Sequence, residues 1–125
     1  IGTTFARRSV YRTVIRSGRN RFLDAFDCPD PSTKTPRRAV TTTPLQALSL
    51  LNSNFVLRMA DRLSARVRRE TDNTLPARIR LAFRLCFARP PTATEAETSL
   101  SFAKRHGLPA LARVLFNSNE FLYVD

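Results

Sequence analysis

Arginine is the residue type that offers the most chemistry in this sequence. Of the 21 basic residues all but two are arginines, and Arg58, Arg62, Arg66 and Arg69 recur at intervals of three and four residues. Since an α-helix turns once every 3.6 residues, this spacing predicts one row of guanidinium groups. We expect the row to lie beside an apolar face, with the arginine stems covering its edges. A planar guanidinium fork suits phosphate, sulfate or carboxylate, so Arg58, Arg62 and Arg66 are candidate anion ligands; the alternative is a solvated face neutralised by nearby carboxylates.

A second candidate anion site lies just before Pro44, where Thr as N-cap and Pro at the first position predict the start of a helix. The free N–H groups of a helix start attract anions, and arginines and hydroxyl groups stand beside them in the sequence. The alternative is that these arginines bind the segment to carboxylates of the helices. The candidate residues are Arg37, Arg38, Thr41, Thr42 and Thr43.

The tripeptide Asn-Ser-Asn occurs twice, in LLNSNF and in LFNSNEF. In both places the first Asn can end a helix, because it tolerates the left-handed conformation, and the following Ser or Asn can cap the next one. One interpretation is a repeated stop-and-restart signal; the other is a shared polar site made by the two turns and the neighbouring glutamate. The residues of this polar turn pair are Asn52, Asn54, Asn117, Asn119 and Glu120.

The sequence contains no catalytic or metal-binding pattern that its spacing supports. Cys28 and Cys86 are far apart and His106 is the single histidine, so neither a zinc site nor a c-type haem motif can be assembled. A disulfide between the two cysteines stays open, although a free thiol is favoured at Cys86 because it falls in an apolar helical pattern. We therefore expect no catalytic residue, metal or cofactor within these 125 residues.

Composition limits the class of partner. The formal net charge is +11, which favours anionic partners, while 42% hydrophobic residues indicate a folded domain rather than a disordered tail. Nucleic acid is the less favoured partner, because the charge is spread over every expected helix and no signature of a known DNA-binding module is present. No apolar run approaches the roughly 20 residues that a transmembrane helix needs.

The residues named above are expected on helices. Apolar positions repeat with helical period and predict an all-α fold, a compact bundle of about five to six helices in a single domain over residues 1–125. Three prolines predict one long Pro-rich loop over about 27–43. The expected helices cover residues 5–17, 44–52, 53–70, 75–88, 92–107 and 109–117.

Three details of this bundle can be predicted. Thr92 and Glu95 have the spacing of a capping box, which marks a helix start. The helix over 75–88 is apolar around more than half of its circumference, so we expect it at the centre of the bundle. The apolar tail at 121–124 is expected to dock on the core.

Several segments together resemble a known family. They are Arg8–Arg12, Phe26–Asp30, Arg37-Arg38 with TTTPLQAL, RIRLAFRL followed by RPPT, and the ending NEFLYVD. The pattern resembles the C-terminal domain of unknown function of large planctomycete-type secreted proteins, over essentially the whole chain. The TPLQAL and NEFLYVD segments are the specific ones.

The resemblance implies a context rather than an activity. Proteins of that family often carry a cytochrome-c-like domain with a Cys-x-x-Cys-His haem motif nearer the N-terminus, and none of those haem ligands falls in this chain. It implies an extracytoplasmic parent, at the periplasm or cell surface, with haem c in an upstream domain and with Asp125 near the natural end. The start at Ile1 is likewise typical of a fragment of a larger multidomain protein.

Three functions fit these observations. The favoured one is a helical C-terminal module of a secreted haem-associated protein, used for packing against upstream domains of the same polypeptide or for binding an anionic polymer. The second is a basic nucleic-acid-binding domain. The third is a non-catalytic part of an enzyme whose active residues lie upstream, with Arg37, Arg38 or Glu120 lining a shared cleft.

Overall fold

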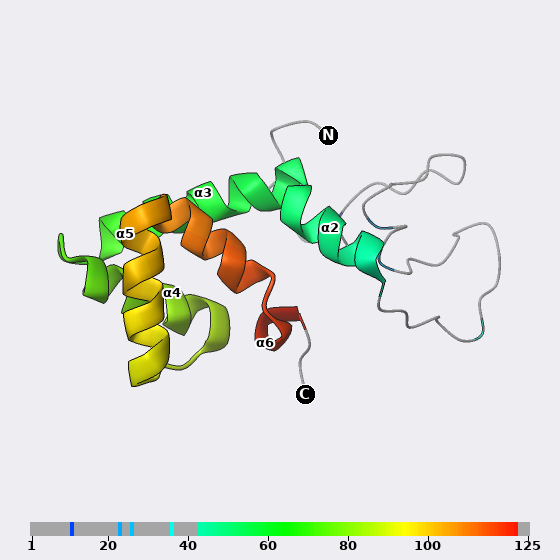
Figure 1. Cartoon of the computed structure of the whole chain (residues 1–125). Coiled ribbons are helices and arrows are strands. Elements are labelled where there is room, and N and C mark those ends of the chain that lie inside the picture. Colours follow the sequence, from blue (N-terminus) through cyan, green and yellow to red (C-terminus); the bar gives the residue numbers. More distant parts are fainter. Residues whose placement is uncertain (1–10, 12–22, 24–25, 27–35, 37–42, 123–125) are drawn as a thin grey trace. The chain divides into compact units, whose positions relative to one another are not determined.

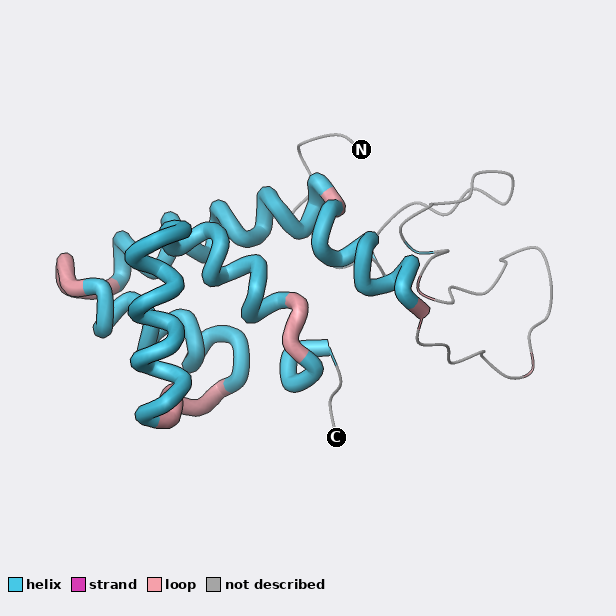
Figure 2. Tube along the Cα trace, in the orientation of Figure 1, coloured by secondary structure: helices cyan, strands magenta, loops and turns pink. Residues whose placement is uncertain are grey.

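The computed structural model describes residues 11, 23, 26, 36 and 43–122. The chain divides into two compact units, residues 1–43 and 44–125, and every helix described below belongs to the second. The described part is helical and contains no strand (Figure 2), which confirms the all-α prediction. The expected helix over 5–17 and the Pro-rich loop over 27–43 fall almost wholly outside the described residues, and the single domain over 1–125 stays a prediction.

The helices begin and end close to their predicted bounds. The ranges expected over 44–52, 53–70 and 75–88 agree with the structure to within one residue. Of the described helices, none is long and apolar enough to span a lipid bilayer. They are α2 (Pro44–Asn52), α3 (Asn54–Glu70), α4 (Leu75–Phe87), α5 (Ala93–Phe116) and α6 (Asn119–Leu122) (Figure 1).

Side-chain caps explain two of the helix starts. The Ser53 hydroxyl accepts a hydrogen bond from the Phe55 N–H at 3.2 Å and caps α3. At the start of α5 the Thr92 hydroxyl accepts from the Glu95 N–H at 3.3 Å, while the Glu95 carboxylate accepts from the Thr92 N–H at 2.7 Å. The predicted capping box is therefore confirmed.

The two helices expected over 92–107 and 109–117 are both present, and they meet at a kink; together they carry the label α5. The kink is at Gly107, whose φ of 83° and ψ of 166° are not helical and lie in a region that is nearly exclusive to glycine. Pro109, which lacks an N–H, follows two residues later at a place where the helical hydrogen bonding has already been interrupted. The sequence signals for a stop and a restart thus mark the place where the first helical segment of α5 ends and the second begins.

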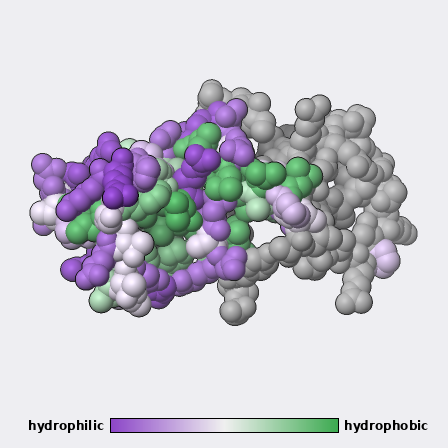
Figure 3. Space-filling model, viewed as in Figure 1, coloured by the Kyte–Doolittle hydropathy of each residue, from purple (hydrophilic) through white to green (hydrophobic). Residues whose placement is uncertain are grey.

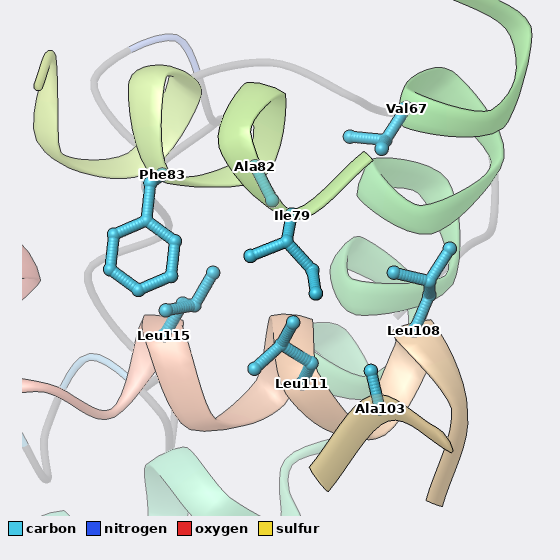
Figure 4. Packing of buried hydrophobic residues seen from close by; sticks show 8 residues of the cluster. All are labelled: Val67, Ile79, Ala82, Phe83, Ala103, Leu108, Leu111 and Leu115. Atoms are coloured by element: carbon cyan, nitrogen blue, oxygen red, sulfur yellow. The ribbon is translucent and has the colours of Figure 1, made fainter. Parts of the chain in front are cut away.

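The hydrophobic core lies between α3, α4 and α5. The side chains of the core point toward one another from these three helices (Figure 4), and the rings of Phe83 and Phe87 meet edge to face with centroids 5.3 Å apart. Burial of such apolar side chains is the main favourable term in folding. The cluster consists of Val67, Ile79, Ala82, Phe83, Ala103, Leu108, Leu111 and Leu115.

The central helix is α5, and the prediction that the helix over 75–88 occupies the centre is wrong. α5 packs extensively on both α3 and α4, whereas α3 and α4 touch each other less. Leu81 and Leu85 of α4 stay half-buried, because the apolar circumference of that helix is wider than the surface that covers it. The buried residues of α5 are Ser99, Ala103, Leu108, Leu111, Ala112 and Leu115.

α2 contributes no residue to the core. It packs on α3, yet Leu45, Leu48 and Leu51, which recur at helical spacing, are all exposed. The space-filling view shows hydrophobic residues at the surface over α2 (Figure 3). α2 also carries no charged residue, so its exposed leucines lie on an uncharged surface.

Candidate functional site

The buried side of α3 determines where its arginines lie. With about 100° per residue, Arg58 and Arg62 lie about 160° from the middle of the buried side and Arg66 about 115° from it. The expectation that the row lies beside the apolar face is therefore wrong for Arg58 and Arg62, which lie opposite. The reason is that Phe55, although apolar, is exposed, so the buried side of α3 is rotated away from it. That side consists of Val56, Ala60, Ser64 and Val67.

Only part of the arginine row is neutralised. The Arg66 Nε lies 3.0 and 3.2 Å from the two carboxylate oxygens of Glu70, and Arg69 approaches the same carboxylate at 3.6 Å. The guanidinium groups of Arg58 and Arg62 have no hydrogen bond or ion pair with any described residue. Two like charges one turn apart destabilise a helix by about 0.2–0.5 kcal/mol, which a bound anion would relieve.

The second candidate anion site cannot be built from the described residues. Arg37, Arg38, Thr41 and Thr42 lie outside them, and Thr43 is exposed immediately before α2 begins. The helix start at Pro44 is where the sequence predicts it. The anion site at this helix start stays a prediction.

The two Asn-Ser-Asn turns meet at Arg113 of α5. Its Nε donates to the Leu51 carbonyl at 2.8 Å and its Nη2 to the Asn52 amide oxygen at 3.4 Å. The Asn117 side chain in turn donates to the Arg113 carbonyl at 2.7 Å. The first Asn of each turn is therefore tied to the same arginine, which sequence reasoning did not include.

The remaining members of the polar turn pair do not join this arginine. Asn54 and Asn119 are the first residues of α3 and α6. Ser118, between the two helices α5 and α6, donates its hydroxyl to the Leu115 carbonyl at 2.7 Å. Arg113 thus links the two helix junctions, and Glu120 takes no part in this contact.

Glu120 binds Arg89 in the loop between α4 and α5. The Arg89 Nε and Nη2 lie 2.7 Å from the two oxygens of Glu120, and its Nη1 and Nη2 lie 2.9 and 2.8 Å from those of Glu95. Both edges of the guanidinium are thus occupied by carboxylates, each in the bidentate geometry that makes such pairs strong. We refer to Arg89, Glu95 and Glu120 as the Arg89 clamp. Spacing offers no signal for it, because Glu120 is 31 positions from its partner.

Electrostatics fix the charge states of the Arg89 clamp. Hydrogen bonds from Arg89, and then from the Thr92 N–H, lower the pKa of Glu95 to about 2. Arg89 likewise lowers the pKa of Glu120, and the two carboxylates raise the pKa of Arg89. All three groups stay ionised near neutral pH, so the clamp holds structure together and does not exchange protons.

Cys86 is a free, half-buried thiol. Burial raises its pKa to about 11, so it is protonated and a weak nucleophile at neutral pH. Of the two states that the sequence left open for this residue, the structure shows the free thiol. Cys28 lies outside the described residues.

Comparison with known proteins identifies one family model. The model, described as PSD1, a protein of unknown function (DUF1553), matches residues 2–103. No curated protein and no solved structure matches the chain. The matched range includes Arg58, Arg62, Arg89 and Glu95, whereas Arg113 and Glu120 lie beyond it.

Proposed function

Since this chain belongs to the PSD1 family of proteins of unknown function (DUF1553), we propose that it is a non-catalytic helical module that binds an anionic polymer through α3. The observation that carries the proposal is the pair Arg58 and Arg62, which have no carboxylate partner among the described residues and lie opposite the buried side of their helix. Arg69, whose side chain is 77% exposed, extends the row.

The spacing of the row favours a polymer over a small anion. Arg58 and Arg62 are about 6 Å apart along the helix axis, and Arg69 is a further 10 Å or so away. A single phosphate or sulfate could contact two of these groups at most. A linear chain that carries repeated negative charges could contact all three.

The setting proposed for the module is a larger polypeptide. The resemblance of its segments to planctomycete-type secreted proteins supports an extracytoplasmic parent with haem c in an upstream domain. In that setting the anionic polymer is an acidic polysaccharide of the cell surface. Nucleic acid is the alternative partner, and the same experiment separates the two.

Fluorescence anisotropy with labelled heparin fragments, at several salt concentrations, tests the proposal. Arg58→Gln/Arg62→Gln should weaken binding about tenfold, which corresponds to about 0.7 kcal/mol for each of the two charge pairs lost. The matched control is Arg80→Gln/Arg84→Gln, which removes two exposed arginines at the same spacing on α4, also without ion pairs among the described residues.

Two outcomes would contradict the proposal. Equal weakening by both double variants would indicate a generic effect of net charge. Tighter binding to an unrelated DNA duplex than to heparin would favour nucleic acid as the partner. In that case the logarithm of the binding constant should fall linearly with the logarithm of the salt concentration, with a slope of about 0.9 for each phosphate that the protein neutralises.

A second function, packing against upstream domains, is favoured by the exposed leucines of α2. An uncharged helix with an apolar surface is typical of a protein interface. Leu45→Ser/Leu48→Ser should leave the stability of the chain unchanged and abolish its association with upstream domains of the parent in a pull-down. The enzyme-subunit alternative has less support, because Arg89 already occupies Glu120.

A further inference from the structure

An ion pair between Glu120 and Arg89 joins α6, the last described helix, to the loop between α4 and α5. We propose that Glu120 and Arg89 form a reversible latch, and that α6 detaches from the loop between α4 and α5 without unfolding of the helical core. The two hydrogen bonds of 2.7 Å between these side chains join residues 31 positions apart. This inference goes beyond the proposed function and does not depend on it.

Among the described residues, few contacts besides the latch hold α6 in place. The helix has four residues and none of them is buried; Phe121 and Leu122 are 40% and 37% exposed. It touches both α4 and α5, and one apolar contact with α5 is the pair Phe116 and Phe121, with ring centroids 5.0 Å apart. Its own backbone bonds, from the Phe121 and Leu122 N–H groups to the Ser118 carbonyl, are local. A segment with so few buried contacts belongs to the low-stability end of a fold.

Arg89 remains in position when the latch opens. Its Nη1 and Nη2 atoms are held by Glu95, whose carboxylate also accepts from the Thr92 N–H in the capping box. Release of Glu120 therefore frees the Nε and Nη2 edge of a guanidinium that is already oriented. That edge can then receive another carboxylate in the geometry that Glu120 now uses.

Acid and salt should both open the latch. The charged groups that face Glu120 are Arg89, which lowers its pKa, and Glu95, which opposes that effect. Glu95 has an additional donor in the Thr92 N–H, so its pKa, about 2, is the more strongly depressed. As pH falls below the ordinary glutamate value of 4.5, Glu120 should thus lose its charge while Glu95 still caps α5. Salt weakens the exposed pair by screening.

Amide hydrogen exchange followed by NMR at neutral pH tests the latch. In Glu120→Gln the Phe121 and Leu122 amides should exchange at least fivefold faster than in the wild type, while the Leu111 and Leu115 amides keep their rates. Raising NaCl from 50 to 500 mM should accelerate the same two amides in the wild type but not in the variant. Glu97→Gln is the matched control, because Glu97 is exposed on α5 and has no ion pair among the described residues.

Each contrary result has a clear meaning. If the Phe121 and Leu122 amides exchange equally in the wild type and in Glu120→Gln, or are unprotected in both, charge does not fasten α6. If the Leu111 and Leu115 amides accelerate to the same extent, α6 opens only with the core. Arg89→Lys, which keeps the charge and loses the fork, should give an intermediate rate; a wild-type rate there would show that bidentate geometry is irrelevant.

Discussion

α2 and the second half of α5 are both leucine-rich helical segments, but the leucines of α2 are exposed and those of α5 are buried. Leu108, Leu111 and Leu115 of α5 are 6%, 3% and 5% exposed. Leu45, Leu48 and Leu51 of α2 have a similar helical spacing and are 65%, 54% and 38% exposed. The segments differ in their neighbours: α5 is packed between α3 and α4, whereas α2, among the described residues, packs on α3 and meets α5 through the polar contacts of Arg113.

The difference teaches that periodicity and burial are separate properties. A row of leucines at helical spacing specifies a face, and packing against a second surface decides whether that face becomes core. In α5 two helices supply that surface. In α2 the face stays exposed among the described residues, which is why it supports a proposed interface rather than a contribution to stability.

The largest expected effect tests this comparison directly. Leu111→Ala should lower the free energy of unfolding by about 2–5 kcal/mol, because it leaves a cavity in the core. Leu48→Ala, the matched change in α2, should alter it by no more than about 0.5 kcal/mol. Urea denaturation followed by circular dichroism measures both. Comparable losses in the two variants would mean that the α2 leucines are core residues.

Removing the kink should give the next largest loss of stability, because the kink directs the second half of α5 into the core. Gly107→Ala should cost about 1–3 kcal/mol, since alanine is strained at the φ of 83° observed there. The control is Ala88, which ends α4 at a φ of 58°. Ala88→Gly should raise the free energy of unfolding by about 0.5–1 kcal/mol by removing left-handed strain. A neutral Gly107→Ala in thermal denaturation would show that the kink is dispensable.

The two Asn turns allow a further comparison of α2 with α5, with smaller expected changes in stability. Asn117 ends α5 with a half-buried hydrogen bond of 2.7 Å, whereas Asn52 ends α2 with an exposed one of 3.4 Å. Asn117→Ala should therefore cost about 1 kcal/mol and Asn52→Ala less than about 0.5 kcal/mol. Chemical denaturation of both variants measures this, and heparin affinity should stay unchanged in each. The reverse order of stabilities would place the stronger junction at α2.

The smallest effect concerns the ionic contacts that reinforce α5 and have no counterpart in α2. The pKa of Glu95 is lowered, so its stabilising contribution is complete above the ordinary glutamate value of 4.5 and is lost as pH falls toward about 2. Thermal denaturation from pH 5 to pH 2 should show this decline in the wild type. Glu95→Gln should flatten it; an equally steep decline in that variant would assign the acid sensitivity to other carboxylates.

Much of the secondary structure could be predicted, because its signals are local. Pro44, the Thr92–Glu95 capping box and Gly107 all act on neighbouring backbone groups, and each marks a boundary that the structure confirms. The candidate site was harder to predict. The row on α3 was found from its spacing, but its position relative to the core was not, because Phe55 looks apolar in the sequence and is exposed in the fold.

The sequence by itself determined the all-α class, the helix bounds and the excess of arginine, since these depend on composition and on contacts within a turn or two. The tertiary structure alone decided that α5 is central, that Arg89 holds both Glu95 and Glu120, and that Arg113 joins two turns distant in sequence. Those pairings depend on how helices pack against one another, and the spacing of residues along the chain does not specify which helix surfaces will be in contact.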